Sequence, residues 1–183
     1  LTFVADGEPT LDIRLGQTIA LLKSFGIKVG VISNGSLLWS SSVRQNLLEA
    51  DWVSLKIDVF QKKTWHQLNC PHKGLRWRTV LEGMLRFADS YLGMLVTETM
   101  LVQGCNTDEV QMRHVRDFIG LLNPAAAYIA IPTRPPACSR VRPPEEKTLH
   151  LAYQIFNKRL PNVELLTVEE GNAFAFTGNV EDD

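Results

Sequence analysis

The turn Asp6-Gly7-Glu8-Pro9 combines residue types that suit the binding of a small cationic group. It follows the apolar run 1–5 and precedes a segment with helical periodicity, so it lies at the carboxyl end of a predicted buried strand. Parallel α/β folds bind ligands at that end. Gly7 allows the backbone to approach a ligand closely, Pro9 rigidifies the exit, and Glu8 supplies a carboxylate for an amine. The alternative is an ordinary strand-to-helix loop with a capping residue.

Further polar residues lie in or just after the other predicted strands: Ser33, Asn34, Lys56, Asp58, Glu98, Asn106, Thr133 and Arg134. Lys56 and Glu98 stand out because each interrupts an otherwise apolar strand. A buried charge is costly unless it is paired or functional. We therefore expect these two residues either to serve a ligand or to pair with each other or face outward at an edge.

Apolar runs and amphipathic segments alternate along the whole chain. The predicted strands are 2–5, 28–33, 52–57, 95–101, 127–132 and 163–168, and the predicted helices are 13–25, 42–50, 78–92, 108–122 and 144–160. This alternation predicts an α/β fold with a parallel sheet, open or curled into a barrel. Right-handed crossovers bring all the carboxyl ends of the strands to one rim, where the polar residues converge.

The composition favours one globular domain, residues 1–183, with 45% hydrophobic and 21% charged residues and a net charge of −1. No apolar run of the length needed to span a membrane occurs. Three widely spaced cysteines, Cys70, Cys105 and Cys138, favour a reducing, cytoplasmic setting and argue against a metal knuckle, although His66, Cys70 and His72 leave a metal site open. Because the chain opens on Leu1 inside a strand-like run, we expect it to be a piece of a longer protein, truncated at its N-terminus and at its C-terminus.

A segment rich in basic and aromatic residues extends from Val59 to Leu81 and contains no acidic residue. It carries Lys62, Lys63, Lys73, Arg76, Arg78, Trp65 and Trp77, and a second basic loop carries Arg134, Arg140 and Arg142. Cations interleaved with aromatic rings suit contacts to phosphates and bases. The alternative is a solvated surface.

Four motifs in order resemble those of the radical S-adenosylmethionine (radical SAM) superfamily, and the resemblance covers essentially the whole chain. Asp6-Gly7-Glu8-Pro9 resembles the family's Gly-Gly-Glu-Pro turn after the second barrel strand, and Ser33-Asn34-Gly35 resembles the Thr-Asn-Gly at the end of the third. Residues 54–58 resemble the fourth strand, and 101–109 the exit of the fifth. The implied fold is a partial (β/α)6 TIM-like barrel, here with its first strand missing and an extra strand at 163–168.

The resemblance implies two cofactors, S-adenosylmethionine and a [4Fe–4S] cluster, which together generate a 5′-deoxyadenosyl radical for hydrogen abstraction. It implies that Gly7, Glu8 and Pro9 hold the methionine end, that Asn34, Ser54 and Asp58 contact the carboxylate and ribose, and that Ile131 and Pro132 flank the adenine. Lys56, Glu98 and Arg134 are the substrate-side candidates. The signature Cys-x-x-x-Cys-x-x-Cys is absent, so the cluster cysteines are expected outside this sequence, together with a reductant such as ferredoxin or flavodoxin.

Within the superfamily, the turn 7–11 and Asn69-Cys70-Pro71 resemble the wybutosine-synthesis branch, which modifies a guanosine in transfer RNA and usually has Asn/Asp-Arg-Pro at the second site. Cys70 stands where that branch has Arg. Two other readings stay open. One is an α/β-barrel lyase with Lys56 as the Schiff-base nucleophile; the other is a non-enzymatic RNA-binding module, supported by the basic loops.

Overall fold

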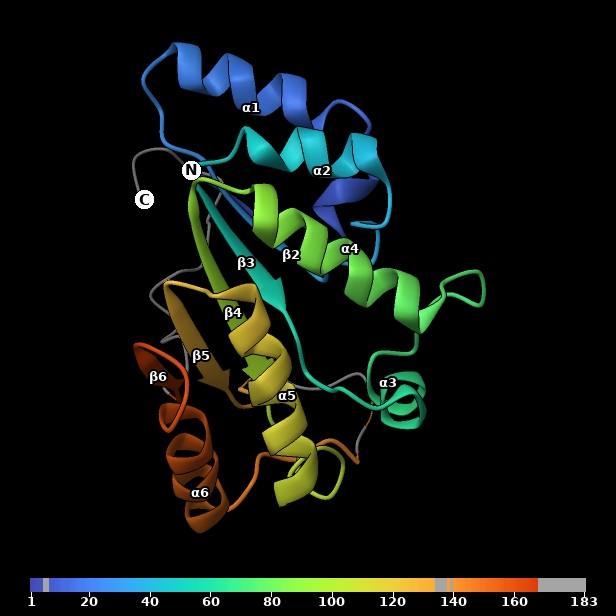
Figure 1. The fold of residues 1–183 in the computed structure, drawn as a ribbon, viewed down its shortest axis with the longest axis vertical. Coiled ribbons are helices and arrows are strands. Elements are labelled where there is room, and N and C mark those ends of the chain that lie inside the picture. Colours follow the sequence, from blue (N-terminus) through green and yellow to red (C-terminus); the bar gives the residue numbers. More distant parts are fainter. Residues whose placement is uncertain (5–6, 134–137, 139, 168–183) are drawn as a thin grey trace, which may run out of the picture.

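The computed structural model describes residues 1–4, 7–133, 138 and 140–167. Within them lies a six-stranded parallel sheet in the order β1-β2-β3-β4-β5-β6. The strands are β1 (Thr2–Phe3), β2 (Gly30–Ser33), β3 (Trp52–Lys56), β4 (Met94–Met100), β5 (Ala126–Ala130) and β6 (Val163–Leu166). The first and last strands do not pair, so the sheet is an open part of a barrel (Figure 1). The predicted α/β class and partial barrel are confirmed.

The helices alternate with the strands, as the sequence pattern predicts. They are α1 (Leu15–Ser24), α2 (Ser41–Leu48), α4 (Trp77–Ser90), α5 (Glu109–Leu122) and α6 (Glu146–Asn157). Two further elements were not predicted, the short 3-10 helix η1 (Pro9–Leu11) and the seven-residue helix α3 (Lys62–Leu68). In α3 only Thr64 and Trp65 are buried, which is too little to produce a readable helical periodicity.

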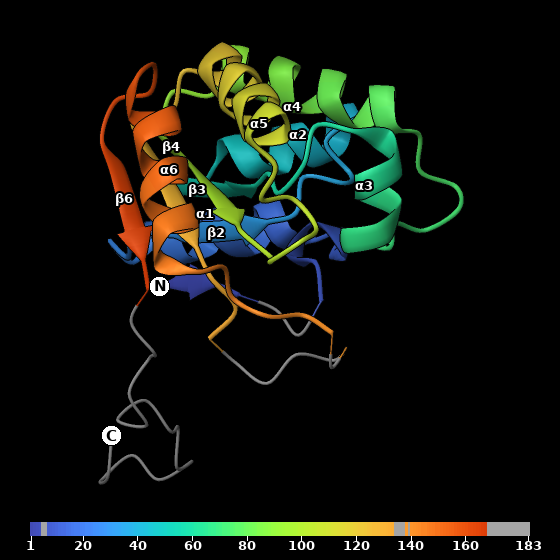
Figure 2. The same ribbon diagram turned by 90° about the horizontal axis from the view of Figure 1, so that it is seen from below.

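Each strand presents alternate side chains to opposite faces of the sheet. One face carries apolar residues such as Val53, Leu55 and Ile129, which form a continuous core with the helices. Figure 2 shows α2, α4 and α5 lying over this face. On the other face Lys56, Glu98 and Tyr128 lie opposite one another on β3, β4 and β5. The apolar residues of these strands thus lie on the helix-covered face, and the charged residues that interrupt them lie in a row on the other face.

Helix α4 packs unusually closely on the connection that follows β2. A Cβ atom on Gly83 would collide with the backbone of Leu38 and Trp39, and one on Gly35 would collide with the Met84 side chain. Gly35 also has a φ of 67°, a conformation that favours glycine. Helix α4 is therefore held firmly beside the carboxyl ends of β2 and β3. Among the described residues, no helix has the length and apolar character needed to cross a membrane.

Candidate functional site

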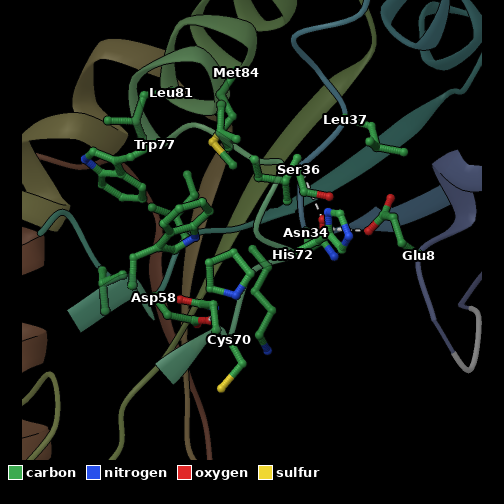
Figure 3. A pocket seen from close by; sticks show the side chains of 18 of the residues that line it. Glu8, Asn34, Ser36, Leu37, Asp58, Cys70, His72, Trp77, Leu81 and Met84 are labelled. Atoms are coloured by element: carbon green, nitrogen blue, oxygen red, sulfur yellow. Dashed lines mark hydrogen bonds between the residues drawn. The ribbon is translucent and has the colours of Figure 1, made fainter. Parts of the chain in front are cut away.

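A cavity of about 450 Å³ opens at the carboxyl ends of the first three strands (Figure 3). Its polar wall comes from the turn after β1, the connection after β2 and the end of β3, which contribute Glu8, Asn34, Lys56 and Asp58. Its other wall comes from α3, α4 and the loop between them. Four of the predicted site residues therefore converge on one cavity, at the rim where parallel α/β folds bind ligands.

The Glu8 carboxylate is the hub of the polar wall. Its Oε1 accepts hydrogen bonds from the Thr10 hydroxyl and the Ser33 hydroxyl, both at 2.6 Å, and from the Thr10 amide at 3.2 Å. Its Oε2 accepts the Asn34 amide at 2.7 Å. Four donors thus fix the orientation of this half-buried carboxylate. In the described residues Oε2 has one partner, which leaves it the capacity to accept a further hydrogen bond.

Among the described residues, no atom other than those of its chain neighbours lies within 4 Å of the position that a Cβ on Gly7, directly before this hub, would occupy. The described part of the chain therefore gives no steric reason for a glycine there. Open space beside the backbone is what the close approach of a ligand requires.

Lys56 and Glu98 form an ion pair across β3 and β4, with Nζ 3.1 Å from Oε1 and side chains 29% and 24% exposed. Burial acts to lower the pKa of the Lys56 ammonium, but the nearby carboxylates of Asp58 and Glu98 outweigh it and raise the pKa above 10.5. The pairing that the sequence left open is therefore present, and Lys56 is held in its charged form.

Asp58 connects the end of β3 to β4 and to the end of α3. Its Oδ1 accepts the Met100 amide at 2.9 Å and its Oδ2 accepts the Asn69 side-chain amide at 2.8 Å. Burial raises the pKa of the Asp58 carboxyl above 3.8, against the lowering effects of Lys56 and these hydrogen bonds. Asn69 ends α3, so this contact anchors the loop that forms the far wall of the cavity.

Asn106 locks the exit of β4 from a fully buried position. Its Nδ2 donates to the backbone oxygens of Asp58 and Met100, each at 2.8 Å, and its Oδ1 accepts the Val102 amide at 2.7 Å. All of the side chain's strong hydrogen-bonding positions except one lone pair are used within the protein. Its part in the site is to position Asp58, and the sequence motif did not reveal that role.

The remaining predicted site residues do not line the cavity. Pro9 is buried in η1, and Ser54 is buried in the middle of β3, below the rim. Glu98 reaches the cavity only through its partner Lys56. Ile131 and Pro132 follow β5 and are half-buried. Arg134 lies outside the described residues.

Sequence reasoning missed the apolar half of the cavity. The apolar half is formed by eight side chains: Ile57, Val59, Trp65, Leu75, Trp77, Val80, Leu81 and Met84. The cavity is also lined by Ser36 and by the loop residues Cys70, Pro71 and His72. The available signal was the pair of tryptophans between Val59 and Leu81, which the sequence pattern indicated as suited to phosphate and base contacts, with a solvated surface as the alternative, but not as the wall of a cavity. Trp65 is instead 7% exposed, and its ring centroid lies 5.1 Å from that of Trp77.

The described residues contain no cluster of three or more His, Cys, Asp or Glu side chains that would hold a metal ion. Cys70, Cys105 and Cys138 are free thiols, and burial raises the pKa of the Cys105 thiol. These residues therefore do not fit an iron–sulfur cluster. The polar wall, by contrast, fits an organic cofactor with a cationic amine, because it presents an oriented carboxylate beside an open glycine backbone.

Curated relatives span the chain. A UPF0026 protein of Methanocaldococcus jannaschii is 41% identical over 185 residues, which cover 100% of this chain and 58% of that protein. A UPF0026 protein of Helicobacter pylori is 33% identical over 152 residues, 81% of this chain and 49% of the relative. The chain thus spans about half the length of the curated relatives it matches. No protein-family model matches it.

Solved structures share the fold at low sequence identity. A domain of the pyruvate-formate lyase-activating enzyme of Bacteroides vulgatus superposes with a TM-score of 0.72, at 16% identity over 90% of this chain and 97% of that one. A radical SAM methyltransferase of Sphaerobacter thermophilus gives 0.69, at 13% identity over 91% and 50%. TYW1 with a lysine–pyruvate adduct gives 0.68, at 15% over 87% and 50%. The chain is therefore similar in sequence to UPF0026 proteins and has the open α/β barrel fold found in a radical SAM methyltransferase.

Proposed function

We propose that this chain is the S-adenosylmethionine-binding core of a radical SAM enzyme. The observation that carries the proposal is the Glu8 hub, a carboxylate oriented by four donors at the mouth of a 450 Å³ cavity. The fold shared with a radical SAM methyltransferase supports it. A carboxylate held in this way needs no reorganisation to receive an ammonium group, which favours binding.

In this proposal, residues of the polar wall contact different parts of the cofactor. Glu8 receives the amine through Oε2, and the open backbone at Gly7 admits the methionine end, while the buried Pro9 rigidifies the turn that holds them. Asn34 and Asp58, on the same wall, serve the carboxylate and ribose, with Ser54 beneath them. Ile131 and Pro132, after β5, flank the adenine. The cofactor, bound with a reduced [4Fe–4S] cluster, supplies the one-electron chemistry of hydrogen abstraction.

Lys56 and Glu98 act on the substrate side, with Arg134 as a further contributor. Their ion pair keeps a charged ammonium at the cavity, where it orients an anionic or carbonyl group of the substrate. The cluster cysteines and the site for a reductant such as ferredoxin or flavodoxin belong, in this proposal, to parts of the protein outside residues 1–183. The likeness to TYW1 supports a substrate in transfer RNA, as the wybutosine branch has.

A second candidate is Schiff-base chemistry at Lys56, because the similar TYW1 structure carries a lysine–pyruvate adduct and Lys56 lines the cavity. The raised pKa of Lys56 opposes it, since an attacking amine must be neutral. Borohydride reduction in the presence of a 2-oxo acid separates the two. Covalent trapping that is lost in Lys56→Met favours the second candidate.

The proposal is tested on the intact protein after anaerobic reconstitution with iron and sulfide. Incubation with S-adenosylmethionine and dithionite should release 5′-deoxyadenosine, and Lys56→Met should retain this reaction because Lys56 lies on the substrate side. An intact protein that acquires a stoichiometric cluster yet neither binds nor cleaves S-adenosylmethionine would refute the proposal.

A further inference from the structure

The segment from Val59 to Leu81, called here the basic segment, forms the wall of the cavity opposite Glu8. It contains α3, the loop 69–76 and the first turns of α4. In Figure 3 Trp77 and Leu81 lie at one end of the cavity and Glu8 at the other. The loop is anchored by the bond from Asn69 to Asp58, so the basic segment is fixed to the rim. It is therefore part of a built cavity and not a detached surface loop.

The positive charge of the basic segment is not neutralised within the described residues. Lys62, Lys63, Lys73, Arg76 and Arg78 are all exposed, and none forms an ion pair there. Elsewhere, Lys23, Arg113 and Arg159 each have a carboxylate partner, and the exposed cations without one among the described residues, such as Lys28 and Arg86, are spread along the chain and not gathered in one segment. Five unopposed cations in a chain of net charge −1 create a local positive field that attracts anions.

The cavity wall that the basic segment contributes is largely apolar and aromatic, with hydrogen-bonding groups nearby. Trp65 and Trp77 pack against each other and both line the cavity. The His72 Nδ1 accepts the Gly74 amide at 3.1 Å, so in the neutral ring the proton is on Nε2 and makes it a donor. Ser36 adds a hydroxyl. The cations do not line the cavity themselves, but Arg76 and Arg78 flank the lining residue Trp77 in the sequence. Aromatic faces, donors and nearby cations together suit a planar ring that carries an anionic group.

We propose that the basic segment is the substrate-recognition element of this site and binds a nucleotide unit. The phosphate contacts the cations of the basic segment, and the base enters the apolar half of the cavity beside Trp65 and Trp77. The proposal rests on the proposed function, because it places this nucleotide beside the cofactor held by the polar wall. A free nucleotide and a nucleotide within RNA present the same chemistry here.

The test measures binding to the intact protein through tryptophan fluorescence, with excess S-adenosylhomocysteine present to occupy the cofactor site. The probes are the four ribonucleoside 5′-monophosphates, the matching nucleosides and a ten-nucleotide RNA of mixed sequence. We expect a mononucleotide or the RNA to bind in a salt-dependent way. Nucleosides should bind about tenfold or more weakly, because they cannot contact the cations.

The decisive variant is Lys62→Ala/Lys63→Ala/Arg76→Ala/Arg78→Ala. Its matched control is Arg14→Ala/Lys28→Ala/Arg86→Ala/Lys158→Ala, which removes four exposed cations outside the basic segment. We expect the first variant to lose about tenfold or more in affinity and the control to change less than about twofold. Binding of the mononucleotide identifies a free nucleotide, and binding of the RNA alone identifies a residue within RNA.

Two results would overturn the inference: no binding of either phosphorylated probe, or equal losses in the variant and its control. Titration with S-adenosylmethionine alone keeps the outcomes distinct. A parent protein that binds the nucleotide but not S-adenosylmethionine contradicts the proposed function and leaves a nucleotide-binding cavity. One that binds S-adenosylmethionine but no phosphorylated probe contradicts only the inference made here.

Discussion

The two faces of the sheet are built from the same strands and differ in almost every physical property. On the helix-covered face, Val53 and Leu55 are completely buried and contact an apolar core. On the other face, their neighbour Lys56 is partly exposed and pairs with Glu98, which lies opposite Tyr128. In β3, the odd-numbered Val53 and Leu55 thus stabilise the fold, and the even-numbered Lys56 contributes to the site. Changes on the first face should act on stability, and changes at the rim and second face should act on binding.

The largest expected effect is on the helix-covered face. Phe87→Ala should lower the free energy of unfolding by about 3–5 kcal/mol, because Phe87 is 0% exposed and its loss leaves a cavity in the core. Phe25→Ala, at a side chain that is 73% exposed, is the control and should cost less than about 1 kcal/mol. Denaturant unfolding checks both. Similar losses in the two variants would show that the core is misplaced.

Glu8→Gln should reduce both stability and cofactor binding, because Glu8 connects the turn after β1 to the end of β2 and also lines the cavity. A glutamine amide turns an N–H group toward at least one of the four donors, so we expect a loss of about 1–3 kcal/mol in stability. Binding of S-adenosylmethionine should fall as well. Glu82→Gln, an exposed residue of α4, should change neither quantity in the same melting and dialysis measurements. A variant as stable as the parent would mean that the hub is looser than described.

Lys56→Met should separate stability from binding. A partly exposed ion pair contributes about 1 kcal/mol or less, so the melting temperature should change little. Substrate-dependent turnover should fall while cleavage of S-adenosylmethionine is retained. Lys147→Met removes the more exposed pair with Glu145 and should leave turnover unchanged. Equal turnover in both variants would remove Lys56 from the substrate side.

The same pair predicts a small pH dependence of stability. The folded-state pKa of Lys56 is raised above 10.5, so its contribution is present below the unfolded pKa and is lost as the pH rises through the folded value. The difference in unfolding free energy between the parent and Lys56→Met should therefore stay constant at neutral and mildly alkaline pH and shrink as the pH rises above 10.5. A constant or growing difference would contradict the raised pKa.

Local patterns predict this fold well because each strand and helix buries an apolar stripe that can be read from the sequence. Strand β3 ends one residue earlier than predicted, and β4 is displaced by one residue at both ends. The helix α3 was missed because its seven residues bury only two side chains. What pattern reasoning found at the site were residues beside strand ends, such as Glu8 and Lys56. Asn69 was singled out only as part of the motif Asn69-Cys70-Pro71, and its role was missed, because its bond to Asp58 joins residues brought together only by the loop.

The apolar half of the cavity could not be predicted from local sequence patterns either. Met84 and Val80 have the helical spacing of ordinary core residues, and nothing in that spacing tells a core position from a cavity wall. The difference depends on how closely α4 packs on the backbone at Leu38 and Trp39, which Gly83 permits. Such close approaches are tertiary features, and the sequence shows them only as an unremarked glycine.

The most direct test of the cofactor site is Gly7→Ala, with Gly120→Ala as its matched control. Among the described residues, neither added methyl group meets a closer atom than the Leu160 side chain, 3.8 Å from the Gly120 position, so each variant should remain within about 1 kcal/mol of the parent in stability. Affinity for S-adenosylmethionine, measured calorimetrically on the intact protein, should fall by about tenfold or more in Gly7→Ala because the methyl group occupies the open space beside the backbone. Gly120→Ala should bind as the parent does. A stably folded Gly7→Ala protein with unchanged affinity would contradict the placement of the cofactor against this turn.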